Sequence, residues 1–153
     1  MNMTKFYEYS QNNSGGSFAV DGDLCHRLLI EAETSKQADA IAEGLGCYWN
    51  GVDAGMDCEC CGDRWYAQWN DDGLTFPYSY GTFSKEEAES LAEVYGVRIE
   101  TVKRTYGNRD TNVILETVEQ YAQYVADRYG WTTPDVRIFY KDGTRKEIYS
   151  NGK

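Results

Sequence analysis

Three segments share one pattern of apolar and polar positions, and each predicts an amphipathic helix. They cover residues 34–46, 84–96 and 118–130, and alanines repeat on one face at helical spacing. Each helix start carries a pair with capping-box spacing: Thr34 with Gln37, Ser84 with Glu87, and Thr117 with Gln120. Each segment ends in a glycine, which predicts a left-handed C-cap. The alanine faces predict helices that lie close against a sheet.

Short alternating or apolar runs around these helices predict strands. The runs are residues 6–10, 27–32, 47–49, 64–69, 97–103, 112–116, 136–140 and 146–149. Turn residues at 106–108 and at 142–143 predict two hairpins. The mixed order of elements predicts an α+β fold, in which three short helices pack on a mixed or mainly antiparallel sheet.

The length of 153 residues predicts a single domain over residues 1–153. Residues 70–83 are polar, contain Pro77 and predict an exposed connection. If the domain has a subdomain hinge, we expect it there.

The chain has neither an apolar signal-like start nor an apolar run of about eighteen residues. We therefore expect a cytoplasmic protein that does not contact a membrane. In that compartment five cysteines, an odd number, favour reduced thiols or metal ligands over disulfides.

The net charge of −10 lies mostly in the front half, where residues 1–76 hold 13 acidic and 4 basic side chains. This charge disfavours direct nucleic-acid binding and favours basic partners. It also keeps a protein soluble, which is the simpler interpretation.

Three cysteines lie within the sequence Asp57-Cys58-Glu59-Cys60-Cys61-Gly62-Asp63-Arg64-Trp65. Cys58 and Cys61 have the C-x-x-C-G form of a zinc knuckle, but no second pair follows. We expect Cys60 to be left out, because three thiols this close reach one ion only on an unusual loop. The predicted zinc ligands are therefore Cys58 and Cys61, completed from Cys47, His26 and Cys25. The alternative is a reduced cysteine-rich turn.

The loop at residues 10–17 is rich in amide side chains and glycine. Its glycines allow backbone amides to converge on an anion, and its side chains can read polar groups of a nucleotide or peptide. A plain polar turn is the alternative. We predict one binding site from this loop and the end of the cysteine motif, formed by Asn12, Asn13, Ser14, Gly15, Gly16, Asp63, Arg64 and Trp65.

Residues 6–18, Ile30-Glu31-Ala32 and residues 57–65 resemble an uncharacterised family of small tailed-bacteriophage proteins. The resemblance covers about residues 1–70 and brings no established activity with it. It implies a phage accessory protein made in the cytoplasm of an infected bacterium.

We expect a binding protein that serves counter-defence or host takeover, either by inhibiting a host protein or by sequestering a small nucleotide signal. A zinc-stabilised structural or interaction module is an alternative, and a homo-oligomer stays open. A small metal-dependent hydrolase is the enzymatic alternative. It is disfavoured because His26 is the only histidine and no catalytic motif is present.

Overall fold

The computed structural model describes residues 4–103 and 109–151, and it contains the three predicted helices. These are α1 (Ser35–Leu45), α2 (Lys85–Tyr95) and α3 (Val118–Tyr129). The side chains of Thr34, Ser84 and Thr117 accept hydrogen bonds from the backbone amides of Gln37, Glu87 and Gln120. A complete capping box forms at α3, where the side chain of Gln120 also bonds the Thr117 amide.

The glycines that end the helices differ in conformation. Gly96 is left-handed with φ 64°, and Gly46 has φ 121°, so both need glycine. The prediction of a left-handed cap is wrong for Gly130, which is extended with φ −67° and ψ 137°. Close approach explains this glycine, because a Cβ atom there would lie 2.4 Å from the carbonyl oxygen of Ala126 and 2.4 Å from Cγ of Asp135.

Within the described residues, seven strands form two sheets. This confirms the α+β class, although we expected one sheet. The first has the order β1-β2-β6-β7, with β1 (Lys5–Ser10), β2 (Arg27–Ala32), β6 (Val136–Phe139) and β7 (Arg145–Ile148). Its β2 and β6 are parallel, and its other pairs are antiparallel. The second is antiparallel with the order β3-β5-β4, from β3 (Tyr78–Phe83), β4 (Arg98–Lys103) and β5 (Arg109–Leu115).

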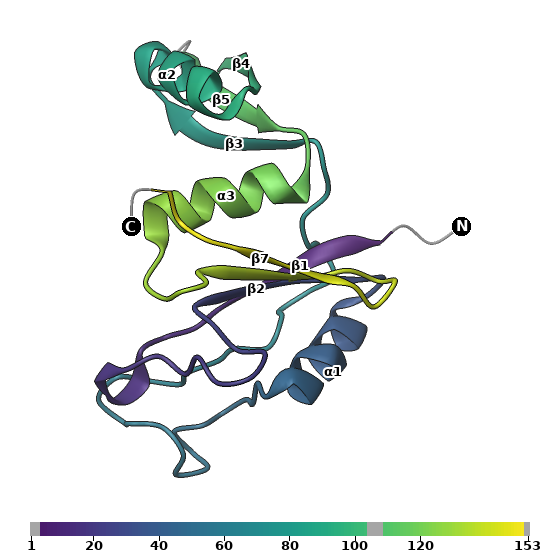
Figure 1. The fold of residues 1–153 in the computed structure, drawn as a ribbon, viewed down its shortest axis with the longest axis vertical. Coiled ribbons are helices and arrows are strands. Elements are labelled where there is room, and N and C mark those ends of the chain that lie inside the picture. The colour runs from purple at the N-terminus through teal and green to yellow at the C-terminus, as the bar shows by residue number, and fades with distance from the viewer. Residues whose placement is uncertain (1–3, 104–108, 152–153) are drawn as a thin grey trace.

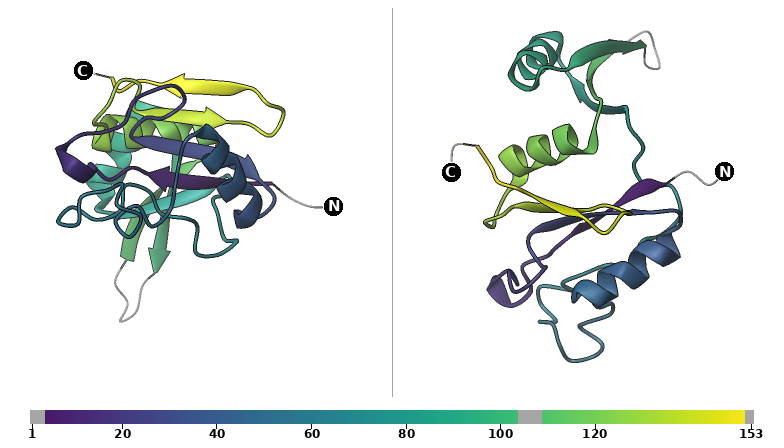
Figure 2. Two further views of the ribbon diagram at one scale, coloured as in Figure 1. Left: turned by 90° about the horizontal axis from the view of Figure 1, so that it is seen from below. Right: turned by 45° about the vertical axis from the view of Figure 1, so that its right-hand side comes forward.

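Helix α3 lies between the two sheets, whereas α1 lies on the opposite face of the four-stranded sheet (Figure 1; Figure 2). One core surrounds α3 and includes Leu115, Ala122 and Ile138. A second core fills the space beneath the four-stranded sheet, where Leu28 packs with Ala38 of α1. The alanine faces of the helices allow this close packing.

Two strand predictions are wrong, since residues 47–49 and 64–69 are irregular. The apolar side chains in these runs, Cys47 and Trp65, are nevertheless buried in the second core. A strand was missed instead at β3, inside the stretch that we expected to be an exposed connection. The turn predicted at 106–108 lies outside the described residues, and the hinge near 70–83 stays a prediction.

Among the helices of residues 4–103 and 109–151, none combines the length and the apolar character that a membrane span requires.

Gly130→Ala tests the close approach at the end of α3. We expect it to lower the free energy of unfolding by about 1–3 kcal/mol, because the new methyl group overlaps Ala126 and Asp135. Urea denaturation measures this change. The control is Gly44→Ala in α1, where a Cβ atom meets nothing within 4 Å. It should raise stability by about 0.5–1 kcal/mol, and equal losses in both variants would contradict the explanation.

Candidate functional site

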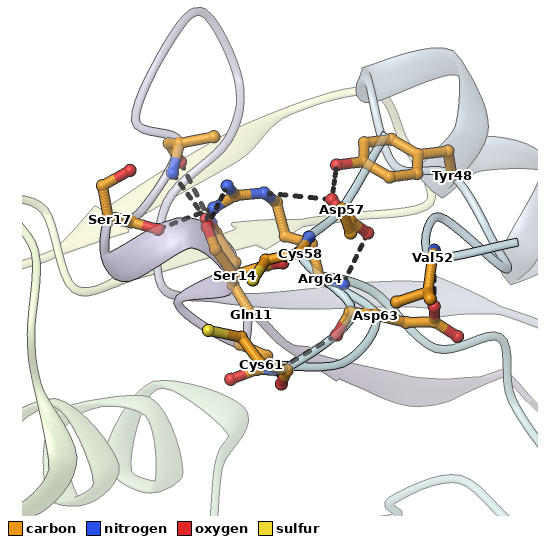
Figure 3. Close-up of polar contacts among 12 residues, drawn as sticks. Gln11, Ser14, Ser17, Tyr48, Val52, Asp57, Cys58, Cys61, Asp63 and Arg64 are labelled. Carbon is orange, nitrogen blue, oxygen red and sulfur yellow. Dashed lines mark hydrogen bonds and ion pairs between the residues drawn. The ribbon is translucent and has the colours of Figure 1, made fainter. Parts of the chain in front are cut away.

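Arg64 is the centre of a hydrogen-bond network that joins two distant loops (Figure 3). Its Nη1 donates to Oε1 of Gln11 at 2.9 Å and to the carbonyl oxygen of Ser17 at 2.8 Å. Its Nη2 donates to the carbonyl oxygen of Ser14 at 2.7 Å. The sequence of the 10–17 loop allowed its amides to converge on an anion, with a plain polar turn as the alternative. The structure instead turns two of its carbonyl groups toward a cation.

Asp57 holds Arg64 from the other side. The Asp57 side chain is 1% exposed, and its Oδ2 accepts a 2.8 Å hydrogen bond from the Arg64 amide. Its Oδ1 lies 3.9 Å from Nε of Arg64 and accepts a 2.6 Å bond from the hydroxyl of Tyr48. The pKa of Tyr48 is raised, mainly by burial and to a smaller extent by this bond to Asp57. The phenol therefore stays a neutral donor to the buried carboxylate.

Further bonds fix the cysteine motif to the 10–17 loop. Nδ2 of Asn12 donates to the carbonyl oxygens of Cys61 at 2.7 Å and of Asp63 at 3.2 Å. The Cys58 amide donates to Oγ of Ser14 at 2.9 Å. The two segments predicted to share a site therefore do lie together, and they form one hydrogen-bonded unit.

Cys58, Cys60 and Cys61 form a thiol triad in which every sulfur lies within 4.8 Å of the other two. The sulfurs of Cys58 and Cys60 are 2.7 Å apart, and those of Cys60 and Cys61 are 3.7 Å apart. Our expectation that Cys60 is left out is corrected, because the turn that closes with Gly62 at φ 89° brings it to the same side. This cluster could hold a metal ion.

The hydrogen bond between two of these thiols separates their acidities. The bond from Cys60 lowers the pKa of Cys58, while the same bond raises the pKa of Cys60 to about 11. A thiolate is the form that binds metals. Cys58 is therefore the thiol of this pair that deprotonates first.

The structure does not bring the other predicted ligands into the triad. Cys47 and Cys25 lie in the second core, where burial raises their pKa values to about 12 and about 11. His26 is 6% exposed, and its ring lies 5.1 Å from that of Phe18.

The predicted binding residues divide into supports and surface positions. Trp65 is 1% exposed and belongs to the second core, and Oδ1 of Asp63 accepts a 2.9 Å bond from the Val52 amide. Together with Asn12, Ser14 and Arg64, these residues hold the loops in place. Asn13, Gly15 and Gly16 are exposed.

A hollow of about 260 Å³ opens beside Asn13, lined also by Gln11, Asn12, Phe18, His26 and Trp131. Trp131 is 71% exposed, and its ring stacks at 29° on that of Phe18, with the centroids 6.4 Å apart. Sequence reasoning missed Trp131. Its only signal was an aromatic residue directly after the glycine that ends a helix.

The irregular stretch of residues 47–73, here called the cysteine segment, exposes several large apolar side chains. Met56 is 62% exposed, Tyr66 55% and Trp69 95%. The segment also carries six acidic residues and one basic residue, Arg64. It therefore presents an acidic surface with protruding apolar groups.

The chain belongs to a family described as a domain of unknown function, DUF7296, whose model matches residues 4–115. The match includes the 10–17 loop and the cysteine segment and ends with β5, before α3. No curated protein and no solved structure matches the chain.

Arg64→Lys tests whether the guanidinium holds the two loops together. Lysine keeps the charge but cannot reach three separate acceptors, so we expect a loss of about 2–4 kcal/mol in the free energy of unfolding. Urea denaturation measures it. The control is Arg98→Lys, because Arg98 is 67% exposed and pairs with Glu116 at the surface; its loss should stay below about 0.5 kcal/mol. Similar losses in both variants would remove Arg64 from this role.

Proposed function

We propose that this DUF7296 protein is a binding protein that contacts its partner through the cysteine segment. The observation that carries the proposal is the network around Arg64, because it fixes a long irregular segment whose large apolar side chains point to solvent. Long structured segments of this kind in small domains usually serve binding or catalysis. Exposed apolar groups ringed by polar ones mark interaction sites.

We further propose that the thiol triad takes up zinc. A tetrahedral zinc ion with bonds of about 2.3 Å separates its sulfur ligands by about 3.8 Å. The 3.7 Å between Cys60 and Cys61 fits this spacing, whereas Cys58 and Cys60, at 2.7 Å, must move apart by about 1 Å. The turn is exposed, so this adjustment disturbs little of the core. A fourth position is left for water or for a donor from the partner.

The open fourth position also favours the second candidate, a metal-dependent hydrolase, because catalytic zinc sites keep such a position. Charge argues against it. Three thiolates and one zinc ion sum to −1, so they would pull weakly on the electrons of a bound water. Binding is therefore the function that this cluster supports better.

A basic host protein suits the acidic cysteine segment. We propose that this encounter occurs in the cytoplasm of an infected bacterium and serves counter-defence or host takeover, as the resemblance to phage proteins implies. The predicted alternative ligand, a small nucleotide, is disfavoured at the cysteine segment, because Arg64, the one basic residue of this segment, is already bonded to the 10–17 loop.

The zinc site is tested by metal content and affinity. We expect the purified protein to carry about one equivalent of zinc. Cys60→Ser should lower the affinity at least about tenfold in competition with a chromophoric chelator, because it removes a ligand. The control is Cys47→Ala, which should leave zinc affinity unchanged and lower stability by about 1–2 kcal/mol, because this thiol is buried in the core. Loss of zinc from the Cys47 variant alone would overturn the triad.

The binding surface is tested by capture from a bacterial lysate on the immobilised protein. Trp69→Ala should abolish capture of the partner, because a fully exposed tryptophan contributes to contacts and little to the fold. Tyr149→Ala, at an exposed position near the C-terminal end, is the control and should capture normally. Raised salt should also weaken capture, since the partner is expected to be basic. A partner held equally by both variants would contradict the assignment of this surface.

A further inference from the structure

A second hollow lies on the other side of the four-stranded sheet, among β3, α2 and α3. Its volume is about 460 Å³, which is within the usual range for small-molecule sites. We call it the tyrosine pocket; its lining includes Tyr78, Tyr80, Tyr124, Tyr129, Arg128 and Glu87. None of these residues belongs to the surface described above.

Tyr124 contributes a buried hydroxyl next to Arg128, whose positive charge partly offsets the rise that burial causes in the pKa of this phenol. The residue is 1% exposed, and its hydroxyl group makes no hydrogen bond among the described residues. A buried polar group of this kind is destabilising unless something else bonds it. Because Tyr124 lines the tyrosine pocket, a bound molecule is the natural source of that bond.

Arg128 has no carboxylate partner within residues 4–103 and 109–151, and its Nε donates only to the hydroxyl of Tyr129 at 3.3 Å. Other arginines pair with acids: Arg27 with Glu8, Arg64 with Asp57, Arg98 with Glu116, Arg137 with Glu147, and Arg145 with Asp23. Arg128 therefore brings to the pocket wall a positive charge with no direct carboxylate partner among the described residues, although Glu87 lines the same pocket.

A β-bulge shapes the same wall. The pairing of β3 with β5 shifts between Tyr80 and Phe83, and Gly81 has φ 86°. A Cβ atom on Gly81 would lie 2.2 Å from the ring of Phe83. The bulge thus lets an aromatic ring fold over the backbone of an otherwise regular strand, and bulges of this kind often border functional sites.

The lining defines the chemistry of the ligand. The ring of Tyr129 is 42% exposed and can pack against an aromatic base, whereas Tyr80 and Tyr124 pack against each other with their ring centroids 5.0 Å apart. The tyrosine hydroxyls and Arg128 offer hydrogen bonds to an anion. Glu87 on the rim repels a second negative charge. A phosphodiester carries one charge, whereas a terminal phosphate carries about 1.5–2.

We propose that the tyrosine pocket binds a mononucleotide with a single negative charge, whose base packs on the exposed ring of Tyr129 and whose phosphodiester bonds Arg128 and Tyr124. The site is independent of the thiol triad and of the proposed protein partner. Either proposal can therefore fail without the other.

Calorimetric titration with 3′,5′-cyclic AMP and 3′,5′-cyclic CMP tests the site. We expect saturable binding to the wild-type protein, and binding at least about tenfold weaker for adenosine, which lacks the phosphodiester. The dianionic 5′-AMP should bind more weakly than the cyclic nucleotides, and inorganic phosphate should not bind. Absence of saturable binding for both cyclic nucleotides at millimolar concentration would overturn the proposal, as would equal binding of adenosine.

Two variants connect binding to the named groups. Arg128→Gln should weaken cyclic nucleotide binding at least about tenfold, while the control Arg98→Gln should bind as the wild type does. Tyr124→Phe should weaken binding about threefold or more and leave the melting temperature unchanged or higher, because it removes only an unpaired hydroxyl. Unaltered affinity in both pocket variants would place the ligand elsewhere and overturn the assignment.

Discussion

The contact between the Arg64 guanidinium and the carbonyl groups of the 10–17 loop is the interaction on which the arrangement of the cysteine segment depends. The cysteine segment has no strand or helix to satisfy its backbone groups, and buried backbone groups must find partners. Side chains supply many of these partners: Asp57 bonds the Arg64 amide, Asp63 bonds the Val52 amide, and Asn12 bonds two carbonyl oxygens. Arg64 ties these local arrangements to β1 through Gln11.

A charged centre has a structural consequence that an apolar one would lack. The guanidinium has five N–H donors in a fixed plane, and each needs an acceptor at a particular place. The bonds of Arg64 can therefore form in only one relative position of the 10–17 loop and the cysteine segment. Apolar contacts tolerate sliding. The further hydrogen bonds of both side chains offset the desolvation cost of burying the pair of Arg64 and Asp57. This relative position of the two segments also places the thiol triad, because Oγ of Ser14 accepts a hydrogen bond from the Cys58 amide.

The sequence was most informative where structure is decided locally. Caps at Thr34, Ser84 and Thr117 depend on residues three positions away, and all three predicted helices were confirmed. The predictions that were wrong depend on tertiary contacts. Cys47 and Trp65 are buried as strand residues would be, but their backbone is irregular. Position 130 needs glycine because Asp135 packs close to it.

The candidate sites were predictable to different degrees for the same reason. The cysteine motif and the 10–17 loop are compact in sequence, so both could be singled out and expected to meet. The geometry that brings Cys60 into the triad depends on a turn, and no spacing rule provides it. The tyrosine pocket was invisible, because Tyr80 and Arg128 come from elements 48 positions apart and neither belongs to a motif.

A continuous chain of contacts runs between the cysteine segment and the tyrosine pocket. Gln68 donates to the carbonyl oxygen of Glu8, the Glu8 carboxylate bonds Arg27, and the Arg27 guanidinium lies 5.9 Å from the ring centre of Tyr129. Contact alone does not couple two sites, because coupling requires an element with two arrangements that each ligand favours differently. Glu8 is held in one arrangement by Arg27 and also by the hydroxyl of Tyr121. The chain of contacts therefore gives no reason to expect coupling between the two proposed sites, one on each face of the sheet.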